Sequence, residues 1–299
     1  MRRFLALVAA LAFTASCSGG TADGGGAGRA PAGEPAVTVE EAARILRDWT
    51  SRHNKALTSG DEERWRDTVT GALAAPVRAR VKAYGKLPGS ARISLLNPVF
   101  YVPRQSGHPR WFGVAALERT EGGEKQQIMA WFVRAAAKEP WRAGHWLTFK
   151  GRPPELDYDA EGYAVPADDR ALPAAHAAYL ASGDQTALTP DAFSAKARER
   201  EQGDWRAGPG RFRPGPKPSY ALRTKDGGSL VWYGIEQEQT LTGGSAGTLP
   251  ADLRAYLDRS GIDPGERLRT KWQWLAIGYS PTSGRARVLG ESVSLTDAD

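Results

Sequence analysis

Two histidines are the first candidates for a chemical role in this sequence, because they recur in the same local pattern. His53 and His176 each open a segment that reads H-x-x-x-L-x-S-G-D. An imidazole titrates near neutral pH and can act as a general base. No carboxylate stands at a defined spacing from either histidine, so we favour a structural role at a seam between helix and sheet, with each ring hydrogen-bonded to backbone.

Three glutamates form a second candidate group. Glu118, Glu236 and Glu238 stand on expected strands beside apolar residues. A carboxylate inside an apolar pocket has a raised pKa and can take a proton from an acidic C–H, but strand alternation places such residues in solvent equally well. The sequence has no phosphate-binding or dinucleotide loop and no paired-histidine zinc pattern. We therefore expect no catalytic residue, no metal and no cofactor.

The tryptophans are the third group, and ten of them suggest strands or a ligand surface. Aromatic side chains can line an apolar pocket, although they fill cores more often, and we favour the core. The predicted ligand-binding residues are five of these tryptophans and the two recurring histidines: Trp49, His53, Trp111, Trp131, His176, Trp232 and Trp272.

The first residues have the pattern of an export signal. Met1–Arg3 is basic, and the apolar run from Phe4 to Ala15 is too short to span a membrane. Small residues then precede Cys17, the single cysteine. This predicts a signal peptide over residues 1–16. It resembles a bacterial lipobox, which implies a lipid on Cys17. A plain cleaved signal with an incidental cysteine is the alternative.

Residues 17–35 are rich in Gly, Ala and Pro and carry almost no large apolar side chain. Such a segment buries too little surface to offset its ordering entropy, so we expect a flexible tether to the membrane. Nucleic acid is not an expected partner of an exported chain. Basic residues at 78–86 and 196–217 could meet lipid head groups or anionic polymers. A solvated face is the favoured interpretation, because acidic residues are interleaved with the basic residues at 196–217.

The rest of the chain contains a repeat. Besides the histidine segments, Trp111-Phe112-Gly113 and Trp232-Tyr233-Gly234 match each other at nearly the same offset. Two anchors in register predict two copies of one domain, each of about 120 residues. The predicted division is a first domain over 36–150, a linker over 151–168 that Pro and Gly interrupt, and a second domain over 169–299.

Each copy begins with helices and continues with strands. Thr38-x-x-Glu41 is a capping box before an amphipathic helix that Gly60 ends, and Asp61 caps the next helix. Runs rich in β-branched and aromatic residues follow, with connections too short for parallel crossovers. The second copy adds an irregular loop at 203–218 and an insertion at 242–266 with one helix. The fold class is therefore α+β, with helices packed on antiparallel sheet.

Helices followed by a curved meander, with S-G-D between the first helices, resemble the NTF2-like cone fold in tandem. With Cys17 behind the export signal, the chain also resembles uncharacterised envelope lipoproteins of actinobacteria. The resemblance implies an extracytoplasmic, membrane-anchored module. We expect it to bind a small apolar ligand or an envelope protein without catalysis. The alternatives are a cone-pocket isomerase, dehydratase or hydrolase, and a structural partner that uses the 203–218 loop or the 242–266 insertion.

Overall fold

The structure is a computed structural model that describes residues 33–198, 204–216 and 218–299. The predicted signal peptide, Cys17 and residues 18–32 of the predicted tether lie outside these ranges. Glu34–Pro35 form strand β1, which pairs with β3 (Arg104–Gln105). The last residues of the predicted tether therefore already belong to the fold. None of the helices in the described ranges has the length and apolar character needed to cross a membrane.

The N-terminal helices begin and end where local signals predict. Helix α1 spans Val39–Ser59; Thr38 accepts from the backbone N–H of Glu41, whose side chain accepts from the N–H of Thr38. Gly60 ends the helix at a φ of 70°, in the left-handed region that favours glycine. Asp61 then caps α2 (Glu62–Arg66). A short 3-10 turn, η1 (Gly71–Leu73), leads into α3 (Ala74–Tyr84), and a second, η2 (Gly89–Ala91), precedes the first sheet.

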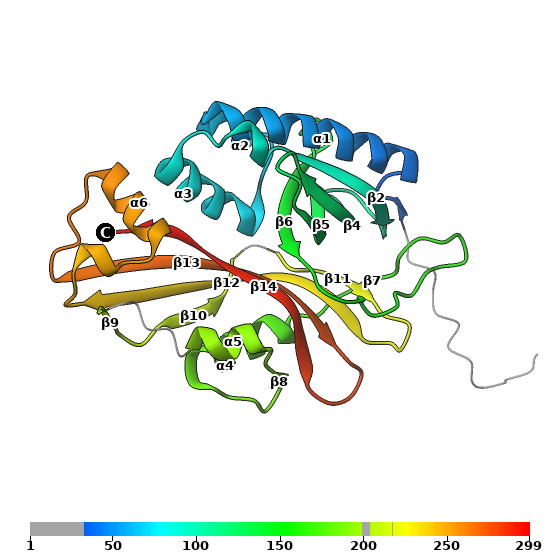
Figure 1. The fold of residues 1–299 in the computed structure, drawn as a ribbon. Coiled ribbons are helices and arrows are strands. Elements are labelled where there is room, and N and C mark those ends of the chain that lie inside the picture. The colour runs from blue at the N-terminus through cyan, green and yellow to red at the C-terminus, as the bar shows by residue number, and fades with distance from the viewer. Residues whose placement is uncertain (1–32, 199–203, 217) are drawn as a thin grey trace, which may run out of the picture. The chain divides into compact units, whose positions relative to one another are not determined.

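The first sheet has the strand order β2-β4-β5-β6, all antiparallel. Its strands are β2 (Ile93–Tyr101), β4 (Arg110–Thr120), β5 (Lys125–Arg134) and β6 (Arg142–Thr148), close to the predicted runs. Helix α1 lies across one face (Figure 1) and buries Leu46 and Trp49 against Phe112 and Phe132. This amphipathic face of α1 positions His53, one turn after Trp49.

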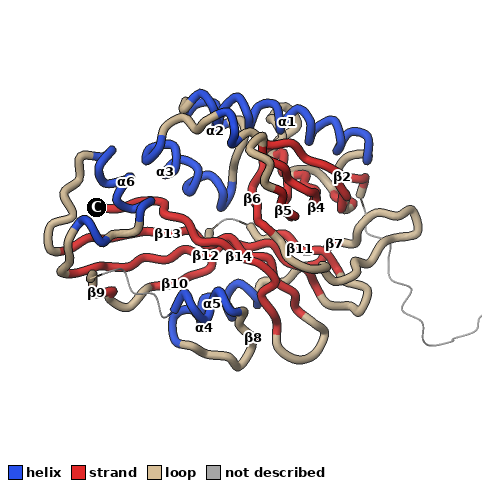
Figure 2. The backbone as a smooth tube through the Cα atoms, in the orientation of Figure 1, coloured by secondary structure: helices blue, strands red, loops and turns tan. Residues whose placement is uncertain are grey.

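The second sheet is larger and has the order β7-β11-β12-β13-β14-β8. The strands of this order are β7 (Pro166–Ala167), β11 (Tyr220–Arg223), β12 (Ser229–Thr242), β13 (Arg267–Ser280), β14 (Ala286–Ala298) and β8 (Leu188–Thr189), and two further short strands pair with β12. Helices α4 (Ala171–Ser182) and α5 (Ala192–Arg198) cover one face (Figure 2). Only the two-residue β8 pairs parallel, so the described part of the sheet is otherwise antiparallel.

The segment 203–218, expected to be irregular, contributes two short strands. β9 (Arg206–Ala207) and β10 (Arg211–Pro214) both pair antiparallel with β12. Proline and glycine predicted a loop, but β12 is long enough to offer a free edge beyond β11. Unpaired backbone N–H and C=O groups on that edge are satisfied by whatever segment lies beside it.

The two sheets share an apolar cluster. Trp111 and Trp131 from the first sheet pack with Tyr220, Trp232 and their neighbours from the second. The ring of Tyr220 lies 4.8 Å from that of Trp111 and 4.4 Å from that of Trp131, centroid to centroid. The anchors W-F-G and W-Y-G therefore meet in space, and a Cβ added to Gly113 would lie 3.6 Å from Trp232.

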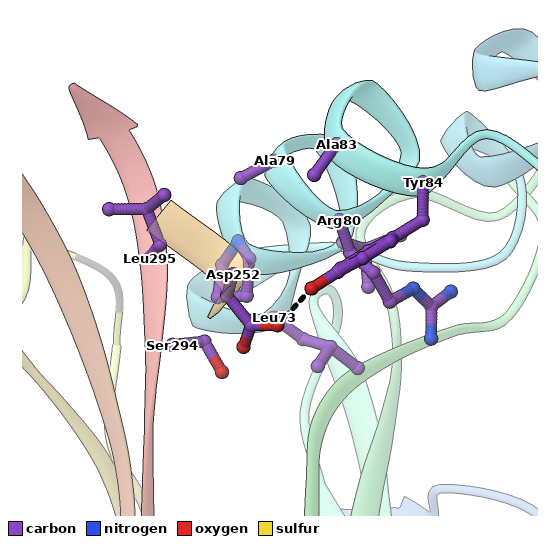
Figure 3. A pocket seen from close by; sticks show the side chains of 10 residues that line it. Leu73, Ala79, Arg80, Ala83, Tyr84, Asp252, Ser294 and Leu295 are labelled. Carbon is purple, nitrogen blue, oxygen red and sulfur yellow. Dashed lines mark hydrogen bonds between the residues drawn. The ribbon is translucent and has the colours of Figure 1, made fainter. Parts of the chain in front are cut away.

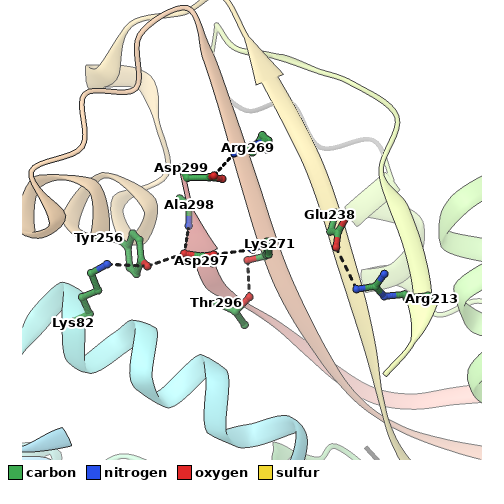
Figure 4. Close-up of polar contacts among 10 residues, drawn as sticks. All are labelled: Lys82, Arg213, Glu238, Tyr256, Arg269, Lys271, Thr296, Asp297, Ala298 and Asp299. Atoms are coloured by element: carbon green, nitrogen blue, oxygen red, sulfur yellow. Dashed lines mark hydrogen bonds and ion pairs between the residues drawn. The ribbon is translucent and has the colours of Figure 1, made fainter. Parts of the chain in front are cut away.

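Helix α6 (Ala251–Ser260), in the predicted insertion, packs against α3 and β14. A polar chain crosses this contact (Figure 4): Lys82 Nζ donates to Tyr256 Oη at 3.1 Å, and Tyr256 Oη donates to Asp297 Oδ1 at 3.1 Å. One face of the insertion is thus occupied within the chain.

The predicted linker is also packed on both sides. The N–H of Ala164 donates to Val102, and the N–H of Asp157 donates to Arg223. The α+β class with helices packed against antiparallel sheets is confirmed. The division into two domains stays a prediction.

Candidate functional site

A cavity of about 510 Å³ opens between α1, α3 and the first sheet. It contains His53, the only one of the seven predicted ligand residues that lines it, and we call it the His53 cavity. Its wall combines helix, turn and strand residues: His53, Leu57, Arg80, Leu87, Ser90, Ala91, Ile93, Glu118, Thr120, Gly122, Glu124, Gln126 and Trp146. This volume lies within the range usual for small-molecule sites, roughly 300–1,000 Å³.

His53 sits in an aromatic setting. Its ring centroid lies 4.9 Å from that of Trp49 and 5.2 Å from that of Trp65, edge-on. Its Nδ1 is 3.4 Å from Asn54 Oδ1, and Asn54 in turn exchanges two hydrogen bonds with the backbone of Ile93. Burial lowers the pKa of His53 to about 4, with a further contribution from the nearby charge of Arg80. The imidazole is therefore neutral at pH 7, and its partner is a side chain rather than the expected backbone group.

Glu118 forms the sheet wall of the cavity. It is only 6% exposed, and its two oxygens accept from Gln126 Nε2 at 2.5 Å and Trp146 Nε1 at 2.9 Å. Both donors are neutral. Strand β4 places Glu118 inward, whereas Glu236 and Glu238 pair with Arg213 at the surface. The three glutamates thus divide between a buried and a solvated setting.

Arg80 forms the helix wall. Its guanidinium lies 4.9 Å from the centroid of the Trp65 ring, an attractive cation–π arrangement. It makes neither a hydrogen bond nor an ion pair with any residue in the described ranges. Burial lowers its pKa from the usual value. Sequence reasoning placed Arg80 only in a basic cluster and had no signal that it faces a cavity.

The predicted tryptophans lie in the cores. Trp49 is 1% exposed and stacks on Trp146 with centroids 4.7 Å apart. Trp111, Trp131 and Trp232 belong to the cluster between the sheets, and Trp272 belongs to the cluster under α6. Their ligand-binding role stays a prediction, and this placement agrees with the core interpretation that the sequence favoured.

His176, which opens the second H-x-x-x-L-x-S-G-D segment, is sealed from solvent. Its Nδ1 lies 3.0 Å from Tyr233 Oη and its Nε2 lies 3.1 Å from Ser194 Oγ. Ser194 donates to Glu291, and the side chains of both His176 and Glu291 are fully buried. Burial lowers the pKa of His176 to about 4 and raises that of Glu291 to about 9. Their 3.4 Å contact is therefore between neutral groups at pH 7.

This cluster has the residue types of a nucleophilic triad but not its arrangement. In such a triad the acid orients the far nitrogen of the histidine. Here the acid contacts the serine, and the far nitrogen contacts Tyr233. Because the side chains of His176 and Glu291 are sealed from solvent, the arrangement stabilises the α4 contact with the sheet and offers no path for a substrate.

A second serine stands in the pattern G-x-S-x-G at 243–247, which sequence reasoning overlooked. That pattern makes a nucleophile only on a sharp turn from strand to helix, with a histidine in reach. Ser245 instead precedes a 3-10 turn, and its backbone holds Asp204 and Trp205 through hydrogen bonds. It has a structural role in the 242–266 insertion.

Two further cavities lie near α6 and β13. One of about 210 Å³, lined mainly by apolar residues, lies between α3, α6 and β14, where Tyr84 donates to Asp252 (Figure 3). The other, of about 710 Å³, is polar and has Arg211 and Arg267 among its basic residues. Among the described residues of the basic cluster predicted over 196–217, only Arg211 lines it. No three metal-ligating side chains are grouped anywhere in the described ranges.

Comparison with known proteins gives a family and relatives. A profile described as "Domain of unknown function (DUF8094)" matches residues 33–299. The "Uncharacterized lipoprotein SCO2278" of Streptomyces coelicolor is 29% identical over 283 residues, 88% of this chain and 85% of that protein. An "Uncharacterized lipoprotein" of Streptomyces avermitilis is 29% identical over 220 residues, 67% of this chain and 65% of that protein. No solved structure matches significantly.

Proposed function

We propose that this chain, which belongs to the family described as "Domain of unknown function (DUF8094)", is a membrane-anchored lipoprotein outside the cytoplasm that binds a small ligand in the His53 cavity. The anchor is supported by the signal that ends at Cys17 and by two relatives that carry the name lipoprotein. The binding role is supported by the cavity itself. Its wall combines apolar side chains with a few convergent polar ones, as is usual for ligand sites.

The anchor has a direct test. Mass spectrometry of the mature chain is expected to show a diacylglyceryl group on Cys17 at the new N-terminus. The Cys17→Ala variant should leave the membrane fraction, because one residue carries the whole attachment. An unmodified Cys17, or a variant that stays with the membrane, would contradict the anchor.

One observation carries the binding role: the two histidines of the recurring H-x-x-x-L-x-S-G-D segment differ in access. His176, on α4, is fully buried, whereas His53 borders an open cavity of about 510 Å³. A core histidine needs no such space. We therefore assign a ligand-binding role to the surroundings of His53 and a structural role to those of His176.

The test uses Trp146, whose indole N–H lies in the cavity wall. A fragment screen by NMR on residues 33–299 is expected to find compounds that shift the Trp146 indole signal. The Trp111 signal, from the cluster between the sheets, is the internal control and should stay in place. If no fragment shifts Trp146 selectively, the cavity is not a binding site.

The two-domain organisation is part of the same proposal. Each half has a helix that buries a histidine-bearing face on antiparallel sheet, and each contributes a W-aromatic-G anchor. An NTF2-like fold for each half predicts that an experimental structure of 36–150 superposes on 169–299 with His53 on His176. Failure of that superposition would remove the tandem relation and leave the His53 cavity proposal intact.

A further inference from the structure

We infer that the ligand of the His53 cavity is a small zwitterion with an apolar body, an amino acid or short peptide, whose carboxylate pairs with Arg80 and whose ammonium pairs with Glu118. The inference rests on the proposed binding function and goes beyond it by naming the ligand chemistry. It comes from two charges that the fold leaves without counter-ions on the walls of one cavity.

The first charge is the guanidinium of Arg80. It is half-buried against Trp65 and has no ion-pair partner in the described ranges. Removing a cation from water without a partner is unfavourable, and the ring of Trp65 offsets only part of that. A carboxylate that enters the cavity would supply paired, charge-assisted hydrogen bonds, the interaction for which a planar guanidinium is best suited.

The second charge is the carboxylate of Glu118. Its partners Gln126 and Trp146 fix its position but carry no positive charge. A carboxylate has about four acceptor sites, and these two donors use half of them. Arg80 does not neutralise Glu118, because the two side chains are not within ion-pair distance, 4.0 Å. A ligand that is positive at one end and negative at the other satisfies both walls.

The rest of the lining decides between a zwitterion and a simple anion. His53 is neutral at pH 7, and Glu124 adds a second carboxylate at the rim. The wall therefore carries one positive and two negative groups, which disfavours a plain anion by repulsion. Leu57, Ile93 and the Trp146 ring provide an apolar surface for the body of the ligand.

The experiment measures affinity on residues 33–299 by titration of the Trp146 indole signal. The probes are leucine, leucyl-leucine, N-acetylleucine, which lacks the ammonium, and leucinamide, which lacks the carboxylate. Each blocked probe is expected to bind about tenfold or more weakly than leucine, since each loses one charge-assisted contact.

Two variants test which residue binds each end of the ligand. Arg80→Gln should weaken leucine about tenfold without weakening leucinamide, and Glu118→Gln should weaken leucine without weakening N-acetylleucine, because each variant also removes a charge that repels the blocked probe. Arg78→Gln is the matched control, because Arg78 is exposed on the same helix. Thermal unfolding checks that each variant folds, and the amide introduced by Glu118→Gln keeps an oxygen that accepts from Gln126 or Trp146.

Three outcomes would overturn the inference. Equal binding of leucine and both blocked probes would show that affinity does not depend on the charges of the ligand. The proposed ligand-binding function would then stand, but the inference of a zwitterionic ligand would be wrong. If leucine and leucyl-leucine do not bind but fragments of other chemistry shift the Trp146 signal, the cavity is a binding site for a different class of ligand, and the inference of a zwitterion is again wrong. If no compound shifts the Trp146 signal, both the proposed binding function and the zwitterionic ligand are contradicted.

Discussion

Gly144 on β6 shows how a single residue positions the cluster between the sheets. The six-membered ring of Trp131 lies close to its backbone, and a Cβ at this position would be 1.8 Å from Trp131 Cη2. Real contacts are never that short, so the ring or the strand would have to move. The absence of a side chain here is what allows Trp131 to reach Tyr220 across the sheets.

We expect Gly144→Ala to destabilise the fold by about 1–3 kcal/mol, the usual range for overpacking a core. The measurement is urea unfolding followed by tryptophan fluorescence. Gly89→Ala is the control, because a Cβ there meets nothing within 4 Å. Equal stability of the two variants would show that the contact of Trp131 with Gly144 does not constrain the cluster.

Helix α1 illustrates what an element contributes to the site. Its capping box fixes where the helix starts, and from that start the helical period places Leu46, Trp49 and His53 on successive turns of one face. The site depends on this register, because a frayed first turn would loosen the packing of the face that carries His53.

Removal of the cap is expected to cost about 1 kcal/mol, so Thr38→Ala should lower the free energy of unfolding by that amount. The orphaned N–H of Glu41 gives the physical reason. Hydrogen exchange should rise in the first turn of α1. Ser106→Ala, at an exposed loop position, serves as the reference and should change neither quantity. Unchanged exchange at the start of α1 would contradict the role of the cap.

At the scale of the whole molecule, buried titratable groups make stability depend on pH. Burial lowers the pKa of His53, His145 and His176 from 6.5 to about 4. As the pH falls through this interval, the unfolded chain binds protons that the folded chain does not, so stability is lost. Glu291 affects stability in the opposite direction. Burial raises its pKa from 4.5 to about 9, so the folded chain keeps a proton that the unfolded chain releases, and stability falls as the pH rises through this interval.

These signs predict a stability maximum between about pH 6 and 7, with a fall on both sides. Glu291→Gln should abolish the fall between pH 7 and 9, because the amide stays neutral in both states. The stability that this variant gains over the parent chain should therefore be larger at pH 8.5 than at pH 6. Thermal unfolding across pH measures this, with the exposed Glu266→Gln as control. A parallel fall in both variants would refute the assignment.

The His53 cavity could be predicted only in part. The sequence pointed to His53 by recurrence and to Glu118 by its apolar strand neighbours. It gave no signal for Arg80, Gln126 or Ser90, because these come from a separate helix, a neighbouring strand and a turn that only the fold brings together. His145 carried no sequence signal either, yet it is fully buried and its Nε2 lies 3.1 Å from the Tyr233 carbonyl oxygen in the other half.

Features that depend on near neighbours follow from the local sequence. Helix caps, glycine ends and the alternation of strands act within a few residues, so α1, α2 and the strands of the first sheet lie where their patterns indicate. Which surfaces meet depends instead on the folding of the whole chain. Three features join distant segments: the pairing of β9 and β10 with β12, the presence of Trp111 and Trp232 in one cluster, and the presence of Arg80 and Glu118 in the wall of one cavity. Such contacts depend on the summed packing of the whole chain, which no local pattern encodes.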